Sequence, residues 1–207
     1  MRLFDRADFE VFQDQTLTGR LGLIQSRLDP KFAIAAPRLQ AALAASGVPD
    51  QFAQVAKHLR RHKNPPPNTW LALSPRARGY KMTPHLELGF WNDRMFLWVA
   101  MLAESKPRLV DWPRVKAAVA QLPEQFELSV DHTKKAVMPL DAQTLTATTT
   151  RFDQVARSEW LIGQTYLRTS PLFDHPDELW ADLLERTEML APVYQALLTP
   201  AKSATAE

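Results

Sequence analysis

The sequence predicts an α+β fold, in which a mostly antiparallel sheet of about four to six strands packs on helices in two layers. Segments with apolar residues three or four positions apart stand at both ends of the chain, whereas alternating or continuous apolar segments occupy the middle third. Runs of strands flanked by runs of helices are typical of this arrangement. A length of 207 residues suits one domain, which we expect over residues 1–200, with a disordered tail at 201–207.

The N-terminal segment predicts helices. Asp5 and Asp8 bracket a short first turn, and residues 17–28 show the apolar spacing of one helix face. The Asp29–Pro30 pair predicts an N-cap followed by proline at the first helical position. The helix that starts there should bend or restart at Pro37, because proline removes a main-chain hydrogen bond, and it should end at Gly47.

The middle of the chain predicts the sheet. Residues 50–62 have helical spacing, although a strand is the alternative for so short a segment, and prolines 65–67 form a stiff extended connector. Strand residues follow at 69–73, and a basic loop follows at 74–79. Residues 85–91 alternate, so that Leu86, Leu88 and Phe90 face one way while His85, Glu87, Gly89 and Trp91 face the other.

A turn at residues 92–93 and the nine-residue apolar run at 95–103 predict a hairpin whose second strand is central and covered on both faces. A short helix is predicted over 112–122 and a strand over 126–131, with Asp131 facing outward. Asp141 predicts the cap of a helix that runs to residue 156. A strand over 159–167 and a last helix over 175–198, kinked at Pro192, complete the chain.

Charge is distributed unevenly, although the formal net charge is only +2. No Asp or Glu lies between Asp50 and Glu87, and such an acid-free segment produces a local positive field that attracts anions. The alternative is that its cations only keep the edge of a sheet solvated. The cations of this acid-free segment are Lys57, Arg60, Arg61, Lys63, Arg76, Arg78 and Lys81.

Three segments together resemble a known family: residues 56–70 (AKHLRRHKNPPPNTW), residues 78–104, which begin RGYK, and residues 129–132 (SVDH). They resemble the YktB-like family of uncharacterised bacterial proteins, whose members have about this length, so the resemblance spans essentially the whole chain. Pro67 departs from the family's usual NPP-polar-TW string by a substitution in the connector. The resemblance implies an α+β fold with a sheet layered on helices, and it implies no activity.

The most basic part of the acid-free segment is the first candidate site. On a helix, Lys57 and Arg61 would share one face, as would His58 and His62. Two histidines at this spacing can chelate a metal, but a metal site also needs a carboxylate or a third histidine, and the surrounding positive charge opposes a cation. We therefore expect no metal. Arg60 and Arg61 are better suited to bind phosphate or carboxylate with paired donors.

The outward face of the sheet is the second candidate site. His85 and Glu87 lie on it two residues apart, and Asp131 lies outward on another strand, followed by His132. If those strands are neighbours, carboxylates and imidazoles share a surface that could perform acid–base chemistry on an anionic substrate. The alternative is the ordinary polar face of a half-exposed sheet.

Aromatic residues interleaved with the cations form the third candidate site. Trp70, Tyr80 and Trp91 could stack on a nucleotide base or on single-stranded RNA. The alternative is that these rings pack a core.

Several classes of site are missing from the sequence. It contains no phosphate-binding glycine loop, dinucleotide fingerprint or nucleophile elbow, and we expect no cofactor. The absence of cysteine excludes disulfides and thiolate catalysis and favours a cytoplasmic location. The longest apolar run has nine residues against the roughly 20 of a membrane helix, and the acidic start does not resemble a secretion signal, so we expect no membrane association.

The leading hypothesis is a protein that binds an anionic ligand, either a phosphorylated metabolite, a nucleotide or RNA, where the basic loop meets an open sheet face. Stacking would come from Trp70, Tyr80 or Trp91. Charge would come from Lys57, Arg60, Arg61, Arg78 and Lys81.

The alternative is an enzyme acting on such an anion. His85 or His132 would transfer the proton, and Glu87 or Asp131 would orient the histidine. A further alternative is an interaction protein whose basic patch contacts an acidic partner, and the sequence does not identify a protein partner.

Overall fold

Seven strands form one antiparallel sheet in the computed structural model, which describes residues 2–106, 110–199 and 201. Their order across the sheet is β1-β2-β3-β4-β7-β5-β6. The sheet has more strands than predicted because short strands, β1 and β6, close its two edges. The strands are β1 (Phe52–Val55), β2 (Asn68–Ser74), β3 (His85–Trp91), β4 (Arg94–Met101), β5 (Glu127–Ser129), β6 (Met138–Pro139) and β7 (Trp160–Leu167).

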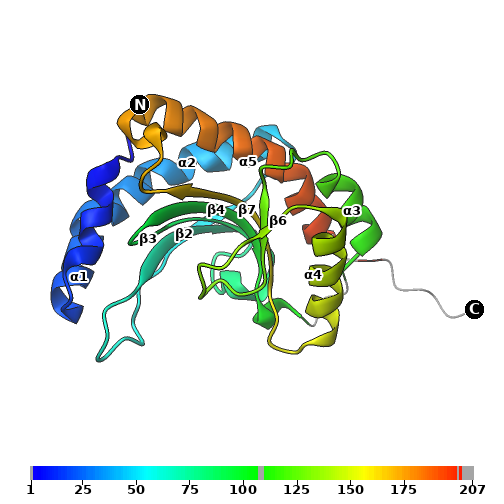
Figure 1. Ribbon diagram of the computed structural model, residues 1–207, viewed down its shortest axis with the longest axis horizontal. Helices are drawn as coiled ribbons and strands as arrows, with labels where there is room; N and C mark the ends of the chain where they lie inside the picture. The colour runs from blue at the N-terminus through cyan, green and yellow to red at the C-terminus, as the bar shows by residue number, and fades with distance from the viewer. Residues whose placement is uncertain (1, 107–109, 200, 202–207) are drawn as a thin grey trace, which may run out of the picture.

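Helices cover one face of this sheet, so the predicted two-layer α+β class is confirmed. Figure 1 shows α2 and α5 lying across the convex side of the curved sheet. None of the helices in the described ranges is long and apolar enough to cross a bilayer. The α-helices are α1 (Leu17–Leu23), α2 (Asp29–Ala45), α3 (Trp112–Val119), α4 (Ala142–Gln154) and α5 (Pro176–Leu198). The remaining helical turns are η1 (Arg6–Gln13), η2 (Ile24–Leu28), η3 (Tyr80–Met82), η4 (Ala103–Ser105) and η5 (Pro171–Asp174).

The predicted alternation of β3 places its two sets of side chains in two different cores. Leu86, Leu88 and Phe90 lie in the larger core between the sheet and the helices. Trp91 lies in a second, smaller core on the other face of the sheet. As predicted, β3 and β4 form a hairpin, and β4 is the middle strand and is buried on both faces.

The second face is covered, although the sequence predicted an open one. Three segments outside the strands cover the aromatic residues of this face. They contribute the side chains of Ala56, Tyr80 and Val137, which pack against the aromatic rings. Every residue of β2 and of β3 is therefore buried. We call this layer of aromatic residues and covering loops the second core; its buried members from the strands and their ends are Trp70, Ala72, Trp91, Phe96, Trp98, Ala100, Leu102 and Leu161.

Two local predictions were wrong. Residues 50–62 contain the edge strand β1, the alternative to the helix that their spacing favoured, because pairing with β2 satisfies their main chain. Asp29 is a helical residue instead of an N-cap, because α2 continues directly from the π-helical turn η2. Of the bend or restart predicted at Pro37, the restart does not occur, since α2 is continuous through this residue. The predicted tail at 201–207 lies, apart from residue 201, outside the described residues.

A buried arginine fixes the proline connector to the N-terminal segment. Arg20 is 7% exposed, and its guanidinium donates to the carbonyl oxygens of Phe12 (2.9 Å), Asp14 (2.8 Å) and Pro66 (3.0 Å). Hydrogen bonds from a charged donor are stronger than neutral ones. The entry of the chain into β2 is thereby held by a residue of α1.

Glycine at position 163 is required by the packing of the second core. Gly163 pairs with Trp98 across β7 and β4, and a Cβ at this position would collide with the carbonyl oxygen of Leu97 and the ring of Trp98. We predict that Gly163→Ala lowers the free energy of unfolding by about 1–3 kcal/mol or more, because the neighbours are main chain and a packed ring.

The control is Gly22→Ala, where a Cβ would meet no atom within 4 Å. In a helix this change should raise stability by about 0.5–1 kcal/mol. Urea unfolding of both variants measures the two effects, and equal stability of Gly163→Ala and the wild type would contradict the packing argument.

Candidate functional site

A pocket of about 490 Å³ lies where the acid-free segment crosses the second core. Its lining brings together eight residues that the sequence predicted, from five separate places in the chain. Arg78 is exposed in the loop after β2 and is not among the lining residues. The eight are Lys57, Arg60, Arg61, Trp70, Tyr80, Lys81, Trp91 and His132, and we call this pocket the basic pocket.

The cations of the basic pocket are not bound to carboxylates in the part of the chain that the structure describes, although the charge of Lys81 helps to lower the pKa of Glu87. Within the described residues, no ion pair of 4.0 Å or less involves Lys57, Arg60, Arg61 or Lys81, although ten such pairs occur elsewhere. The single acidic residue in the described lining is Glu104, which is exposed. Concave surfaces lined by one sign of charge concentrate ions of the opposite sign.

The aromatic residues of the pocket are already used in packing. Trp70 and Trp91 are only 9% and 8% exposed. The indole Nε1–H of Trp70 donates to the hydroxyl oxygen of Tyr80 at 3.1 Å, and the Lys135 ammonium lies 5.6 Å from the centre of the Trp91 ring. The rings therefore form the floor of the pocket and offer little free surface on which a base could stack.

His58 shows why the helical interpretation of residues 57–63 fails. Its main chain has φ of 52°, in the left-handed region, and the residues around it form a loop. The ring lies edge-on to Trp70, and its Nε2 is 3.2 Å from the hydroxyl of Thr69. Burial and the nearby Arg61 lower the pKa of His58 to about 4, so this imidazole is neutral at physiological pH.

His85 and Glu87 form a buried pair beneath the pocket. The two side chains are 0% and 2% exposed, and Nε2 of His85 lies 2.9 Å from a carboxylate oxygen of Glu87. Nδ1 of His85 lies 2.8 Å from the carbonyl oxygen of Thr83, which can only accept, so Nδ1 donates there and Nε2 is left to bond Glu87. Burial would raise the pKa of Glu87, but the hydrogen bond from His85 and the charges of His85, His132 and Lys81 outweigh it and hold that pKa below its ordinary value.

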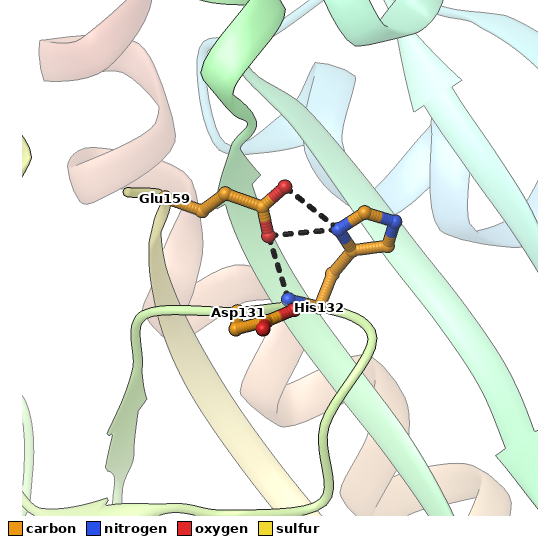
Figure 2. A group of neighbouring side chains, drawn as sticks. All are labelled: Asp131, His132 and Glu159. Atoms are coloured by element: carbon orange, nitrogen blue, oxygen red, sulfur yellow. Dashed lines mark hydrogen bonds and ion pairs between the residues drawn. The ribbon is translucent and has the colours of Figure 1, made fainter. Parts of the chain in front are cut away.

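His132 is held by a residue that the sequence analysis did not select, Glu159. Figure 2 shows the Glu159 carboxylate beside the main-chain nitrogen and the Nδ1 edge of His132. The main-chain N–H donates to Glu159 at 2.6 Å, and Nδ1 lies 2.8 and 2.7 Å from the two carboxylate oxygens. Burial would lower the pKa of His132, but the hydrogen bond to Glu159 and the charge of Glu87 outweigh it and raise that pKa.

Asp131 completes a group of three possible metal ligands, since one ligand atom from each of Asp131, His132 and Glu159 lies within 4.8 Å of the others. Its carboxylate accepts hydrogen bonds from the main chain and hydroxyl of Thr133. Nδ1 of His132 lies at hydrogen-bond distance from both carboxylate oxygens of Glu159, so these two side chains satisfy each other without an ion. The geometry is that of a hydrogen-bonded pair with a neighbouring carboxylate.

The second candidate site assumed that the strands of Glu87 and Asp131 are neighbours, which they are not. β4 and β7 lie between β3 and β5, and the loop after β5 brings His132 back over the sheet. Glu87, Asp131 and His132 line a second pocket of about 20 Å³ beside the basic pocket, while His85 lines neither. Glu159 reaches His132 because β7 pairs with β5, a pairing that residue alternation cannot reveal.

The fold and the site define an α+β protein with one antiparallel sheet and a basic pocket built over buried histidine–carboxylate pairs. A family model described as a domain of unknown function (DUF1054) matches residues 4–194, and the chain belongs to this family. The predicted resemblance to a bacterial family along nearly the whole chain is confirmed.

Relatives of similar length support this assignment. A UPF0637 protein of Lacticaseibacillus paracasei is 42% identical over 198 residues, which cover 96% of this chain and 98% of the relative. A UPF0637 protein of Levilactobacillus brevis is 44% identical over 200 residues, covering 95% and 99%. One of Shouchella clausii is 34% identical over 203 residues, covering 95% of each.

The buried pair generates a testable prediction. Glu87→Leu should lower the free energy of unfolding by about 3–5 kcal/mol, because it removes one partner of a buried pair and leaves Nε2 of His85 without its hydrogen-bond partner. The double variant His85→Leu, Glu87→Leu should be more stable than Glu87→Leu alone, since the imidazole without a partner is removed as well. Urea unfolding at pH 7 measures both variants, and a cost of less than 1 kcal/mol for Glu87→Leu would contradict a buried hydrogen-bonded pair.

Proposed function

We propose that this protein binds a small phosphorylated ligand, a metabolite or a nucleotide, in the basic pocket. The observation that carries the proposal is the gathering of Lys57, Arg60, Arg61 and Lys81 on one pocket without an ion-pair partner in the described chain. Cations that served only to keep a surface solvated would not need to gather around one pocket. A ligand with two or more negative charges supplies the counter-charge that these side chains lack.

The dimensions of the pocket favour a small ligand over RNA. A volume of about 490 Å³ lies within the roughly 300–1,000 Å³ of small-molecule sites. Proteins that bind single-stranded RNA combine a basic groove with exposed rings for successive bases. Here Trp70 and Trp91 are nine-tenths buried. The charged part of the ligand therefore provides most of the recognition.

Two arginines and two lysines suit phosphate in particular. Guanidinium groups donate paired hydrogen bonds to phosphate oxygens, and ammonium groups act as point charges beside them. Arg60 and Arg61 are exposed on the rim, while Lys81 lies deeper and is half-buried. A phosphate between them would be contacted from the loop 56–67 and from η3.

We predict that Arg60→Ala together with Arg61→Ala weakens the binding of inorganic pyrophosphate and of AMP at least tenfold. Hydrogen bonds to charged groups contribute about 1.5–3 kcal/mol each, and one such loss alone corresponds to roughly tenfold or more. The control is Arg76→Ala with Arg78→Ala, which removes the same charge from the same acid-free segment outside the pocket. Isothermal titration calorimetry measures the dissociation constants of both double variants.

If the two double variants weaken anion binding equally, the anion is attracted only by the general positive field of the acid-free segment. That result would contradict binding in the basic pocket. A short RNA that binds more tightly than either probe, and loses affinity by orders of magnitude between 50 and 200 mM salt, would favour the RNA alternative. Failure of every anion to bind the wild type would overturn the proposal and favour an acidic protein partner.

A further inference from the structure

We propose that the basic pocket is an active site for phosphoester hydrolysis, in which His132 transfers the proton and Glu159 positions His132. This inference rests on the proposed binding of a phosphorylated ligand. It names the reaction that the pocket would perform on that ligand.

The first support is the way in which the imidazole is held. Glu159 accepts from both the main-chain N–H and Nδ1 of His132, and its own main-chain N–H donates to the carbonyl oxygen of Val130 at 3.1 Å. The ring cannot turn without breaking these bonds, and Nδ1 must carry a hydrogen. A histidine oriented by a carboxylate in this way is a recurrent arrangement for general acid–base catalysis.

The second support is the direction of the other ring nitrogen. Nε2 lies on the edge of the ring turned away from Glu159 (Figure 2), and within the described residues it has no hydrogen-bond partner. His132 lines the basic pocket and Glu159 does not. The side chain of His132 is 15% exposed, so it reaches the pocket while most of the ring is shielded.

The third support is the lack of a thiol or an activated hydroxyl among the described lining residues. The chain has no cysteine, and no serine lines the basic pocket. The hydroxyl of Thr133 donates to Asp131 at 2.6 Å, and burial raises the pKa of Tyr80 far above its ordinary value. The group that His132 can activate is therefore a water molecule, and the reaction is hydrolysis.

In the reaction, the oxygen of water forms a bond to phosphorus while the bond from phosphorus to the ester oxygen breaks. Nε2 of His132 accepts one proton from the water and then donates it to the ester oxygen of the departing alcohol. The products are inorganic phosphate and the alcohol, and His132 returns to its neutral form. Lys57, Arg60 and Arg61 offset the negative charge of the phosphoryl group in the transition state.

The charges around His132 set the pH dependence. Burial lowers the pKa of the His132 ring, but Glu159, just before β7, and Glu87 on β3 raise it by more. The positive charge of Lys81 in η3 lowers this pKa, and Asp131 precedes His132 in the loop. The neutral ring is the active base. The rate should therefore increase as pH rises through this raised pKa and reach a plateau above it.

The test measures release of p-nitrophenol from p-nitrophenyl phosphate and from bis(p-nitrophenyl) phosphate by the full chain between pH 5 and 9, with EDTA present. We expect turnover by the wild type. His132→Asn should lower kcat by 10²-fold or more, with the affinity for inorganic phosphate changed by only a few-fold.

Glu159→Gln should lower kcat and move the rising limb of the pH profile to lower pH, because the charge that raises the pKa of His132 is gone. A merely structural role would not move that limb. The control pair is His175→Asn and Glu178→Gln, an exposed histidine and carboxylate 3.8 Å apart on another surface, and both variants should match the wild type. If Glu159→Gln fails to fold, the kcat of the His132→Asn variant and the pH profile of the wild type test the proposal instead.

The outcomes separate this inference from the proposed function. Phosphate binding without hydrolysis of either ester overturns the hydrolase and leaves the anion site in place. Loss of turnover with EDTA, or full turnover by His132→Asn, also overturns the assignment to His132. Failure of the wild type to bind inorganic phosphate, pyrophosphate and AMP overturns the proposed function itself.

Discussion

Burial of the central strands on both faces is the constraint on which the other features depend. The helices cover one face, and loops cover the other, so β2 and β3 have no solvent-facing side. Polar side chains on such strands lose their hydration and must find partners within the protein. His85 and Glu87 satisfy this requirement with each other and with a main-chain carbonyl. Covering the second face therefore produces a buried histidine–carboxylate pair beneath a pocket, where an open sheet would have produced a solvated polar surface.

Two glycines allow the second core to be thin. The ring of Phe96 lies over Gly89, and the ring of Trp98 lies over Gly163, in places where a Cβ would collide with them. Aromatic rings can therefore lie close to the sheet, and Tyr80 and Val137 pack onto this layer. The floor of the basic pocket is formed by the buried Trp70 and Trp91, and exposed residues of the acid-free segment form its rim.

Sequence patterns predicted the parts of the molecule that depend on local periodicity. The alternation of residues 85–91 correctly assigned side chains to the two faces. Four cations of the acid-free segment line the basic pocket, whereas Lys63, Arg76 and Arg78 do not. Alternation gives the face of a residue but neither its neighbours across the sheet nor what covers it. The pairing of β7 with β5, which brings Glu159 to His132, and the cover provided by Ala56, Tyr80 and Val137 depend on contacts distant in sequence.

The three main-chain contacts of Arg20 have a consequence for how the protein can be divided. A fragment that begins at β1 would retain every strand and every cation of the pocket, but it would lose the guanidinium that holds Pro66. The loop between β1 and β2 would keep the main-chain hydrogen bond from Ala56 to Trp70 and the contacts of His58 with β2, but it would lose its bond to the N-terminal segment. The smallest unit that can be transplanted with its pocket intact thus includes the N-terminal helices, although none of their residues lines that pocket.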